Sequence, residues 1–177
     1  MRNRLIRRAK VAAAIGAVAI TAGGCKPEKD FPAEPVIAFK SLAQYQNANP
    51  QLTDSASFVV TFTDGDGDIG LSASDLQPPF DTGSTYYYNL FLEMDTVRDG
   101  VWGRVQLLLP LHYRIPYITP TGQNKALEGE IAVALKPWPI AGTAAEPWDS
   151  VRFSATLVDR ALHISNEVLS PPVRVQP

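Results

Sequence analysis

The chain has 177 residues, with 16 basic and 18 acidic side chains and a formal net charge of −2. Five basic residues fall within the first ten positions, and without them the rest of the chain carries a net charge of −7. This acidity excludes the basic footprint that nucleic acid requires. The single cysteine excludes an internal disulfide, so a hydrophobic core or bound ions must stabilise the fold.

Residues 1–24 have the three parts of a secretory signal peptide. A basic head precedes an apolar stretch at 11–21, and the small residues Ala22-Gly23-Gly24 lead directly to Cys25. The apolar stretch is too short to cross ~30 Å of hydrocarbon as a helix. The junction resembles the lipobox of bacterial lipoproteins, which implies that residues 1–24 are removed and that Cys25 is lipidated. A bacterial cell envelope location follows, with a lipid anchor in a membrane, the outer membrane by preference.

Residues 25–34 are expected to form a flexible tether between the lipid and a folded domain. The stretch is charged, contains two prolines and shows no apolar period. Its acidic and lysine-rich character is similar to the surface-export signals of Bacteroidota-type lipoproteins. The sequence leaves open which side of the membrane the domain faces. The remaining residues, 35–177, suit one domain of ordinary size.

Short apolar runs predict β-strands in this domain. The clearest is 57–63, where Phe58, Val60 and Phe62 alternate with smaller or polar residues, as on a half-buried strand. The next run, 86–97, is expected to place Tyr88, Leu90, Leu92 and Met94 on one face.

The dipeptide Asp99-Gly100 separates this run from a second one at 101–109 and predicts a hairpin. Further strands are expected at 35–39, 113–118, 130–136, 150–158 and 168–175. No segment after residue 24 keeps a helical apolar period over about 12 residues, which leaves room only for short helical turns near 41–46 and 72–76. Seven to eight short strands with turn signals between them predict an all-β fold, an immunoglobulin-like antiparallel β-sandwich.

An acidic loop follows the strand at 57–63. Asp64, Asp66 and Asp68 alternate with glycines, so their carboxylates repel one another unless a cation lies among them. Calcium is the natural candidate, because it takes six to eight oxygen ligands. The loop is not an EF-hand, because Ile69 occupies the position that requires glycine. The alternative is a solvated tight turn, which Asp and Gly also favour.

Sandwich topology is expected to place the loop 159–166 at the same pole. Asp159 thereby becomes a fourth candidate metal ligand. Further expected neighbours are Asn166, Glu128 and Glu130. Arg160 offers the opposite solution, because bidentate pairing with the acidic loop would make a metal unnecessary. The sequence leaves both arrangements open.

Three segments carry a family resemblance. Residues 62–71, 127–131 and 158–166 resemble a group of Bacteroidota-type lipoproteins with a single bacterial immunoglobulin-like domain. The last segment is also similar to the Asp-x-Ala-Gly-Asn-x-Ser ending of bacterial immunoglobulin-like domains. The resemblance covers most of residues 35–175. It implies an immunoglobulin-like fold and an envelope location, and it implies no activity.

Catalytic residues are not expected. Cys25 is committed to lipid, and His112 lies between apolar and aromatic neighbours in a strand-like run. His163 shares one short loop with Asp159 and Ser165, whereas the partners of a catalytic triad usually come from separate elements. The chain is therefore predicted not to be an enzyme.

Binding is the expected role. The main hypothesis is an envelope lipoprotein that acts as an adhesion, scaffold or partner-binding module, with a protein or glycan partner and a structural calcium. The alternative is an accessory carbohydrate-binding lipoprotein, in which Trp102, Trp138 and Trp148 form an exposed face for stacking on sugar rings.

Overall fold

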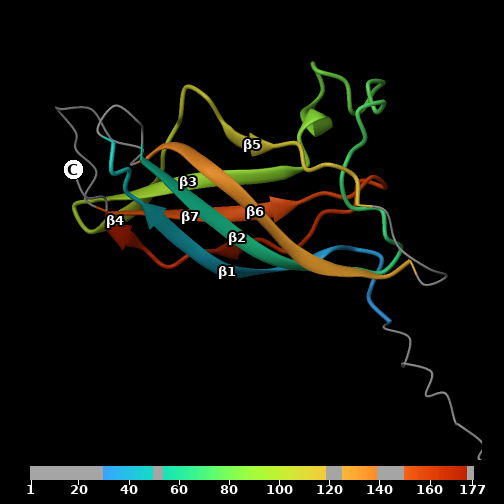
Figure 1. Cartoon of the computed structure of the whole chain (residues 1–177), viewed down its shortest axis with the longest axis horizontal. Coiled ribbons are helices and arrows are strands. Elements are labelled where there is room, and N and C mark those ends of the chain that lie inside the picture. The colour runs from blue at the N-terminus through green and yellow to red at the C-terminus, as the bar shows by residue number, and fades with distance from the viewer. Residues whose placement is uncertain (1–29, 50–53, 119–124, 139–149, 175–177) are drawn as a thin grey trace, which may run out of the picture.

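The computed structural model describes residues 30–49, 54–118, 125–138 and 150–174. These ranges form an antiparallel β-sandwich of two sheets, which confirms the expected all-β fold (Figure 1). The expected signal peptide, Cys25 and the first part of the tether lie outside the described residues. Within the described ranges, no helix has the length and apolarity needed to cross a bilayer.

The first sheet contains β1 (Val36–Tyr45), β2 (Asp54–Asp64) and β6 (Leu127–Trp138), in the order β1-β2-β6. The central strand β2 alternates as its sequence predicts, with Phe58, Val60 and Phe62 buried in the core. Residues 41–45, where the sequence allowed a short helical turn, belong to β1 instead.

The second sheet has the order β4-β3-β7-β8, with β5 also paired to β3 and β9 paired to β7. Its strands are β3 (Leu90–Arg98), β4 (Val101–Arg104), β5 (Leu111–Tyr113), β7 (Ser150–Leu157), β8 (Val168–Leu169) and β9 (Val173–Arg174). The two sheets correspond to the A-B-E and C′-C-F-G sheets of an immunoglobulin-like sandwich. The described ranges contain nine strands, because the last expected strand is split into β8 and β9.

The predicted hairpin joins β3 to β4. Asp99 and Gly100 both have positive φ, at 51° and 77°, which is the backbone of the two-residue turn that matches the twist of antiparallel strands. The second strand of the hairpin is shorter than expected, because ladder pairing ends at Arg104.

The expected strand at 113–118 is wrong in its position. The ladder with β3 is made by β5, which ends at Tyr113. Pro116 has no N–H to give to a ladder, and the amide of Ile115 donates instead to Asn89 Oδ1 at 2.6 Å. The segment after β5 bonds residues 69–71 instead. The Leu71 N–H donates to the Ile115 carbonyl at 2.8 Å, and the N–H groups of Tyr117 and Ile118 donate to the carbonyls of Leu71 and Ile69, both at 3.1 Å.

Tyr88 does not share the buried face of β3, contrary to the prediction. It follows a 3-10 helix, η1 (Thr85–Tyr87), and lies before the first residue of the strand. Its side chain is exposed, whereas Leu90, Leu92 and Met94 are buried as expected.

Aromatic rings connect the two sheets. The ring of Phe153 on β7 lies 6.2 Å from that of Phe58 on β2 and 6.1 Å from that of Trp138 on β6, measured between ring centroids. The loops that follow β2 and β7 lie at one end of the sandwich, together with the N-terminal segment (blue in Figure 1), and the turn from β3 to β4 lies at the other.

Candidate metal centre

Four aspartates meet at the end of the sandwich where β2 and β7 finish. Asp64 is the last residue of β2, Asp66 and Asp68 follow it, and Asp159 comes two residues after β7. One carboxylate oxygen from each of the four lies within 4.8 Å of the others. The structure thus confirms that Asp159 joins the acidic loop at one pole, as the predicted topology requires. A metal ion could be held by these four side chains.

Local hydrogen bonds fix the loop. The Asp68 N–H donates to Asp64 Oδ2 at 3.0 Å, and Gly67 takes a positive φ of 72° that lets the chain turn back between them. Asp68 Oδ2 in turn accepts the N–H of Ala161 at 3.0 Å, and the Arg160 N–H donates to the Asp68 carbonyl at 3.3 Å. The two loops that supply the carboxylates are therefore joined to each other.

Two carboxylate oxygens in the cluster have no hydrogen-bond partner in the part of the chain that the structure describes. The side chain of Asp64 is fully buried, and its Oδ1 has no hydrogen-bond partner among the described residues. Asp68 Oδ1 is also buried and has none within the same ranges. A buried anionic oxygen without a donor costs free energy, typically about 1–3 kcal/mol or more. A cation at the centre of the cluster would remove this penalty.

The pKa values of both carboxyl groups are raised for this reason. Burial raises the pKa of Asp64 to about 6, and the charges of Asp66 and Asp68 add to the effect. Burial also raises the pKa of Asp68 to about 6, with further contributions from the charges of Asp159 and Asp66. Ionisation of the metal-free cluster is therefore unfavourable. A divalent cation would favour the ionised carboxylates and so lower these pKa values.

Arg160 does not fill the role that the sequence left open for it. Its guanidinium pairs with Asp75 Oδ1 at 3.3 Å and lies over the ring of Tyr117, 5.1 Å from the centroid. Only its backbone N–H reaches the acidic loop, at the Asp68 carbonyl. Within the described residues, the carboxylates of the cluster have no arginine hydrogen bond.

The other expected neighbours lie outside the group of four. Asn166 Oδ1 accepts the N–H of Ile37, and Asn166 Nδ2 donates to the Ile37 carbonyl, both at 2.9 Å. Glu130 pairs with Lys40. Glu128 lies opposite Thr63 in the ladder between β2 and β6.

His163 contacts the site, although the sequence analysis considered it beside Asp159 only for a catalytic triad. Its backbone N–H donates to Asp159 Oδ1 at 2.8 Å, and its Nδ1 lies 2.9 Å from Asp159 Oδ2. This hydrogen bond and the charge of Asp159 raise the pKa of His163. The signal in the sequence was the four-residue separation within a tight loop, where Leu162 takes a positive φ of 70°.

A serine triad is not assembled in this loop. The Ser165 hydroxyl accepts the N–H of Leu157 at 2.9 Å and donates to the Asn166 carbonyl at 2.8 Å. It is therefore used in joining the loop to β7.

The proposed aromatic face is not formed as expected. Trp138 is buried against Phe153, and its Nε1–H donates to Gln44 Oε1 at 2.9 Å, because its indole fills the space between the sheets. Trp102 is half-buried beneath the guanidinium of Arg152, 4.5 Å from the ring centroid. Trp148 lies outside the described residues.

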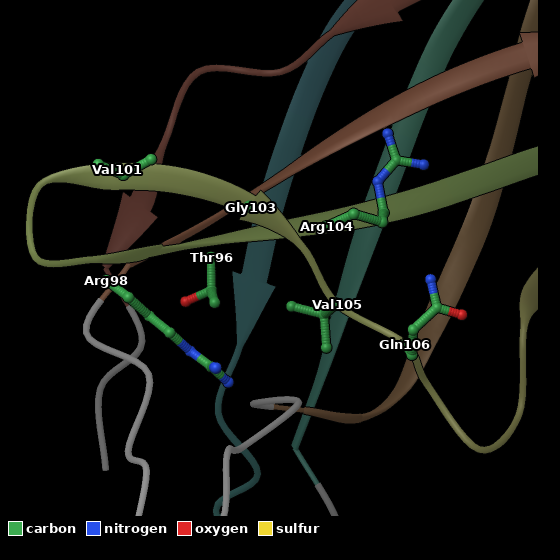
Figure 2. Close-up of a pocket in the computed structure, with 7 residues that line it drawn as sticks. All are labelled: Thr96, Arg98, Val101, Gly103, Arg104, Val105 and Gln106. Atoms are coloured by element: carbon green, nitrogen blue, oxygen red, sulfur yellow. The ribbon is translucent and has the colours of Figure 1, made fainter.

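A separate pocket of about 520 Å³ lies along β3 and β4, at the opposite end of the sandwich. Figure 2 shows Thr96, Arg98 and Val105 on one side of the hairpin ribbon, with the guanidinium of Arg104 turned away. Arg104 pairs with Asp95 at 2.8 Å. The described lining contains no carboxylate or histidine.

Comparison of the chain with family models, with curated proteins and with solved structures gives no significant match. The chemistry of the acidic pole therefore carries the functional proposal.

Proposed function

We propose that this protein is a non-catalytic, lipid-anchored module of the bacterial cell envelope, whose β-sandwich holds a structural Ca²⁺ at its acidic pole and serves as a scaffold for partner binding. The main observation in favour of a cation is the carboxylate of Asp64. It is fully buried, and one of its oxygens has no hydrogen-bond partner among the described residues. The anchor rests on the signal-like residues 1–24 followed by Cys25.

The donor set favours Ca²⁺ over other metals. All four candidate ligands are carboxylates, which are hard oxygen donors, and calcium accepts six to eight oxygens in flexible geometry. Zinc prefers sulfur and imidazole nitrogen, and none of the four candidate ligands supplies either. Magnesium retains several waters and demands an octahedral site. Calcium therefore fits the cluster best.

A structural role follows from the position of the cluster. The cation would join the loop after β2 to the loop after β7, which come from opposite sheets. It would reduce the repulsion among carboxylates that are brought together by folding itself. Loss of the cation should therefore lower the stability of the whole sandwich.

Thermal unfolding of the chain with millimolar Ca²⁺, and then with excess chelator, tests the cation site. A ligand present at ~100 times its dissociation constant stabilises the folded state by about 2.7 kcal/mol, which raises the melting temperature by several degrees. Asp66→Ala should abolish the shift, because it removes one of the four candidate ligands. Asp66 is exposed, so the substitution leaves the core intact. Asp99→Asn, in the exposed turn at the other end, is the control, because asparagine tolerates the positive φ of that position. Equal melting of the wild-type protein in both conditions would contradict the proposal.

The anchor has a separate test. Cells that make the wild-type protein should incorporate labelled fatty acid into it and retain it in the membrane fraction. Cys25→Ser should abolish both. Unchanged labelling in that variant would exclude Cys25 as the lipidated residue.

A further inference from the structure

The N-terminal segment lies directly on the acidic loop. The N–H of Gly65, the residue between Asp64 and Asp66, donates to the Pro32 carbonyl at 2.8 Å. A Cβ placed on Gly65 would lie 2.2 Å from the Phe31 carbonyl oxygen, which is closer than any real contact. The absence of a side chain at Gly65 thus allows the backbone of residues 31–32 to pack between two candidate ligands.

The same segment is fastened to the other loop of the site. The side-chain amide of Asn166 bonds both the N–H and the carbonyl of Ile37, as described above. Asn166 belongs to the loop that supplies Asp159. The entry to β1 therefore contacts both loops whose carboxylates form the cluster, and all three segments lie at one end of the sandwich (Figure 1).

The segment also brings a charge to the site. Glu34 is exposed and lies between Pro32 and Ile37, the two residues that bond the loops of the cluster. The segment thus adds a further carboxylate at the end of the sandwich that already carries four. A divalent cation would cancel two of those charges and so lessen the repulsion that opposes docking.

We propose that the acidic pole is a docking surface for the chain's own residues 31–37, and that binding of the cation and docking of this segment are coupled. The inference rests on the proposed cation site. The cation orders the loop around Gly65 so that it can receive the Pro32 carbonyl, and the docked segment stabilises the cation in return, because such coupling is reciprocal. In a chain anchored through Cys25, this segment is the connection between anchor and domain, so the cation would fix how the domain is held at the membrane.

Gly65→Ala in the full chain tests the coupling. Gly65 is not among the positive-φ glycines, so its backbone accepts alanine, and the contacts that obstruct the new Cβ belong to residues 31–32. We expect calorimetry to show Ca²⁺ affinity weakened by about tenfold or more, although no carboxylate is removed. Gly103→Ala, where a Cβ meets nothing within 4 Å, is the matched control and should bind as the wild type does.

Hydrogen exchange of the Gly65 amide gives a direct readout in the unmodified protein, because that amide is the donor to Pro32. Ca²⁺ should slow its exchange by about tenfold or more relative to chelator. Glu34→Gln, which removes a charge at an exposed position, should reduce that difference and serves if Gly65→Ala does not fold.

The outcomes separate the two proposals. If the wild-type protein binds no Ca²⁺, both the site and the coupling are wrong. If it binds Ca²⁺ but Gly65→Ala binds equally well, or Gly65 exchange does not depend on Ca²⁺, the coupling alone is overturned.

Discussion

Asp64 places a carboxylate where no water reaches it, at the last position of a core strand. The neighbouring positions Phe62 and Val60 are buried to fill the sandwich, and the period of two carries Asp64 onto the same face. A buried acid at the end of an apolar row stabilises the fold only when something compensates its charge. Asp64 therefore has opposite effects on stability with and without a cation.

Asp64→Asn should reverse its effect between the two conditions. In chelator the variant should be more stable than the wild type, by about 1–3 kcal/mol, because the amide removes a buried uncompensated charge. In Ca²⁺ it should be less stable than the wild type, because a ligand is lost. Denaturant unfolding measures both values, with Asp99→Asn as an exposed control that changes neither. A variant less stable in both conditions would contradict this account.

The raised pKa values of Asp64 and Asp68 predict the pH dependence of the metal-free protein. Both shift from 3.8 to about 6, so the folded state binds more protons than the unfolded state between these pH values. Stability must then fall as pH rises from about 4 to 7, by a few kcal/mol in total. The raised pKa of His163 adds a further fall in stability only above pH 6.5, the usual value for this group. Ca²⁺ should suppress the fall, and unfolding curves measured across this range with chelator and with Ca²⁺ check both statements.

Side-chain partners were the hardest features to predict from the sequence. The grouping of Asp64, Asp66, Asp68 and Asp159 followed from strand period and topology alone. The bond from His163 to Asp159 did not, because it depends on one positive φ at Leu162. Only the alternative hypothesis of a sugar-binding face required Trp138 at the surface, and the residue is buried at the end of β6.

At the scale of elements, one arginine holds the long connection between β2 and β3. Arg114 Nη1 donates to the carbonyl of Tyr87 at 2.7 Å, and its Nη2 donates to those of Asp75 and Ser72 at 2.8 and 3.1 Å. The guanidinium also lies 5.0 Å from the centroid of the Tyr87 ring. A planar group with several fixed donors can bond separate carbonyls at once, which an ammonium group cannot reproduce.

Arg114→Lys should therefore loosen residues 72–88 and cost about 1–3 kcal/mol. Limited proteolysis should cut the variant within this range while the β-strands stay protected. Lys136→Gln, at an exposed position of β6, is the control and should resist cleavage as the wild type does. Cleavage first in another region would show that Arg114 does not hold this connection.

Strands with a strict period or a clear turn were predictable, and those set by side-chain bonds were not. The alternation of Phe58, Val60 and Phe62 and the turn at Asp99-Gly100 are local signals, and both were confirmed. The segment after Tyr113 left the ladder with β3 and bonds instead the side chain of Asn89 and the backbone of residues 69–71, both far away in sequence. A pattern read along the chain cannot detect such a competitor.

On the scale of the whole molecule, Phe153 is the residue through which the sheets meet. Its ring contacts Phe58 and Trp138, which belong to two different strands of the opposite sheet. Phe153→Ala should cost about 3–5 kcal/mol, because it leaves a cavity between the sheets, and Phe153→Leu should cost less. Chemical denaturation measures both. Val101→Ala, at a side chain that is 70 % exposed, should change stability little. If Phe153→Ala lowers the free energy of unfolding only slightly, the main contact between the sheets lies at another residue.

The amide of Asn166 has one more consequence, for association between molecules. β1 is an edge strand, and the free N–H and carbonyl of such a strand invite a foreign strand to add to the sheet. At Ile37 both the N–H and the carbonyl are already bonded by the side-chain amide of Asn166, which takes the place that an added strand would occupy. A few residues further on, the register shift between Phe39 and Ser41 bends the edge away from a flat template. Asn166 and the bulge in β1 thus both oppose the addition of a strand from another molecule to this edge.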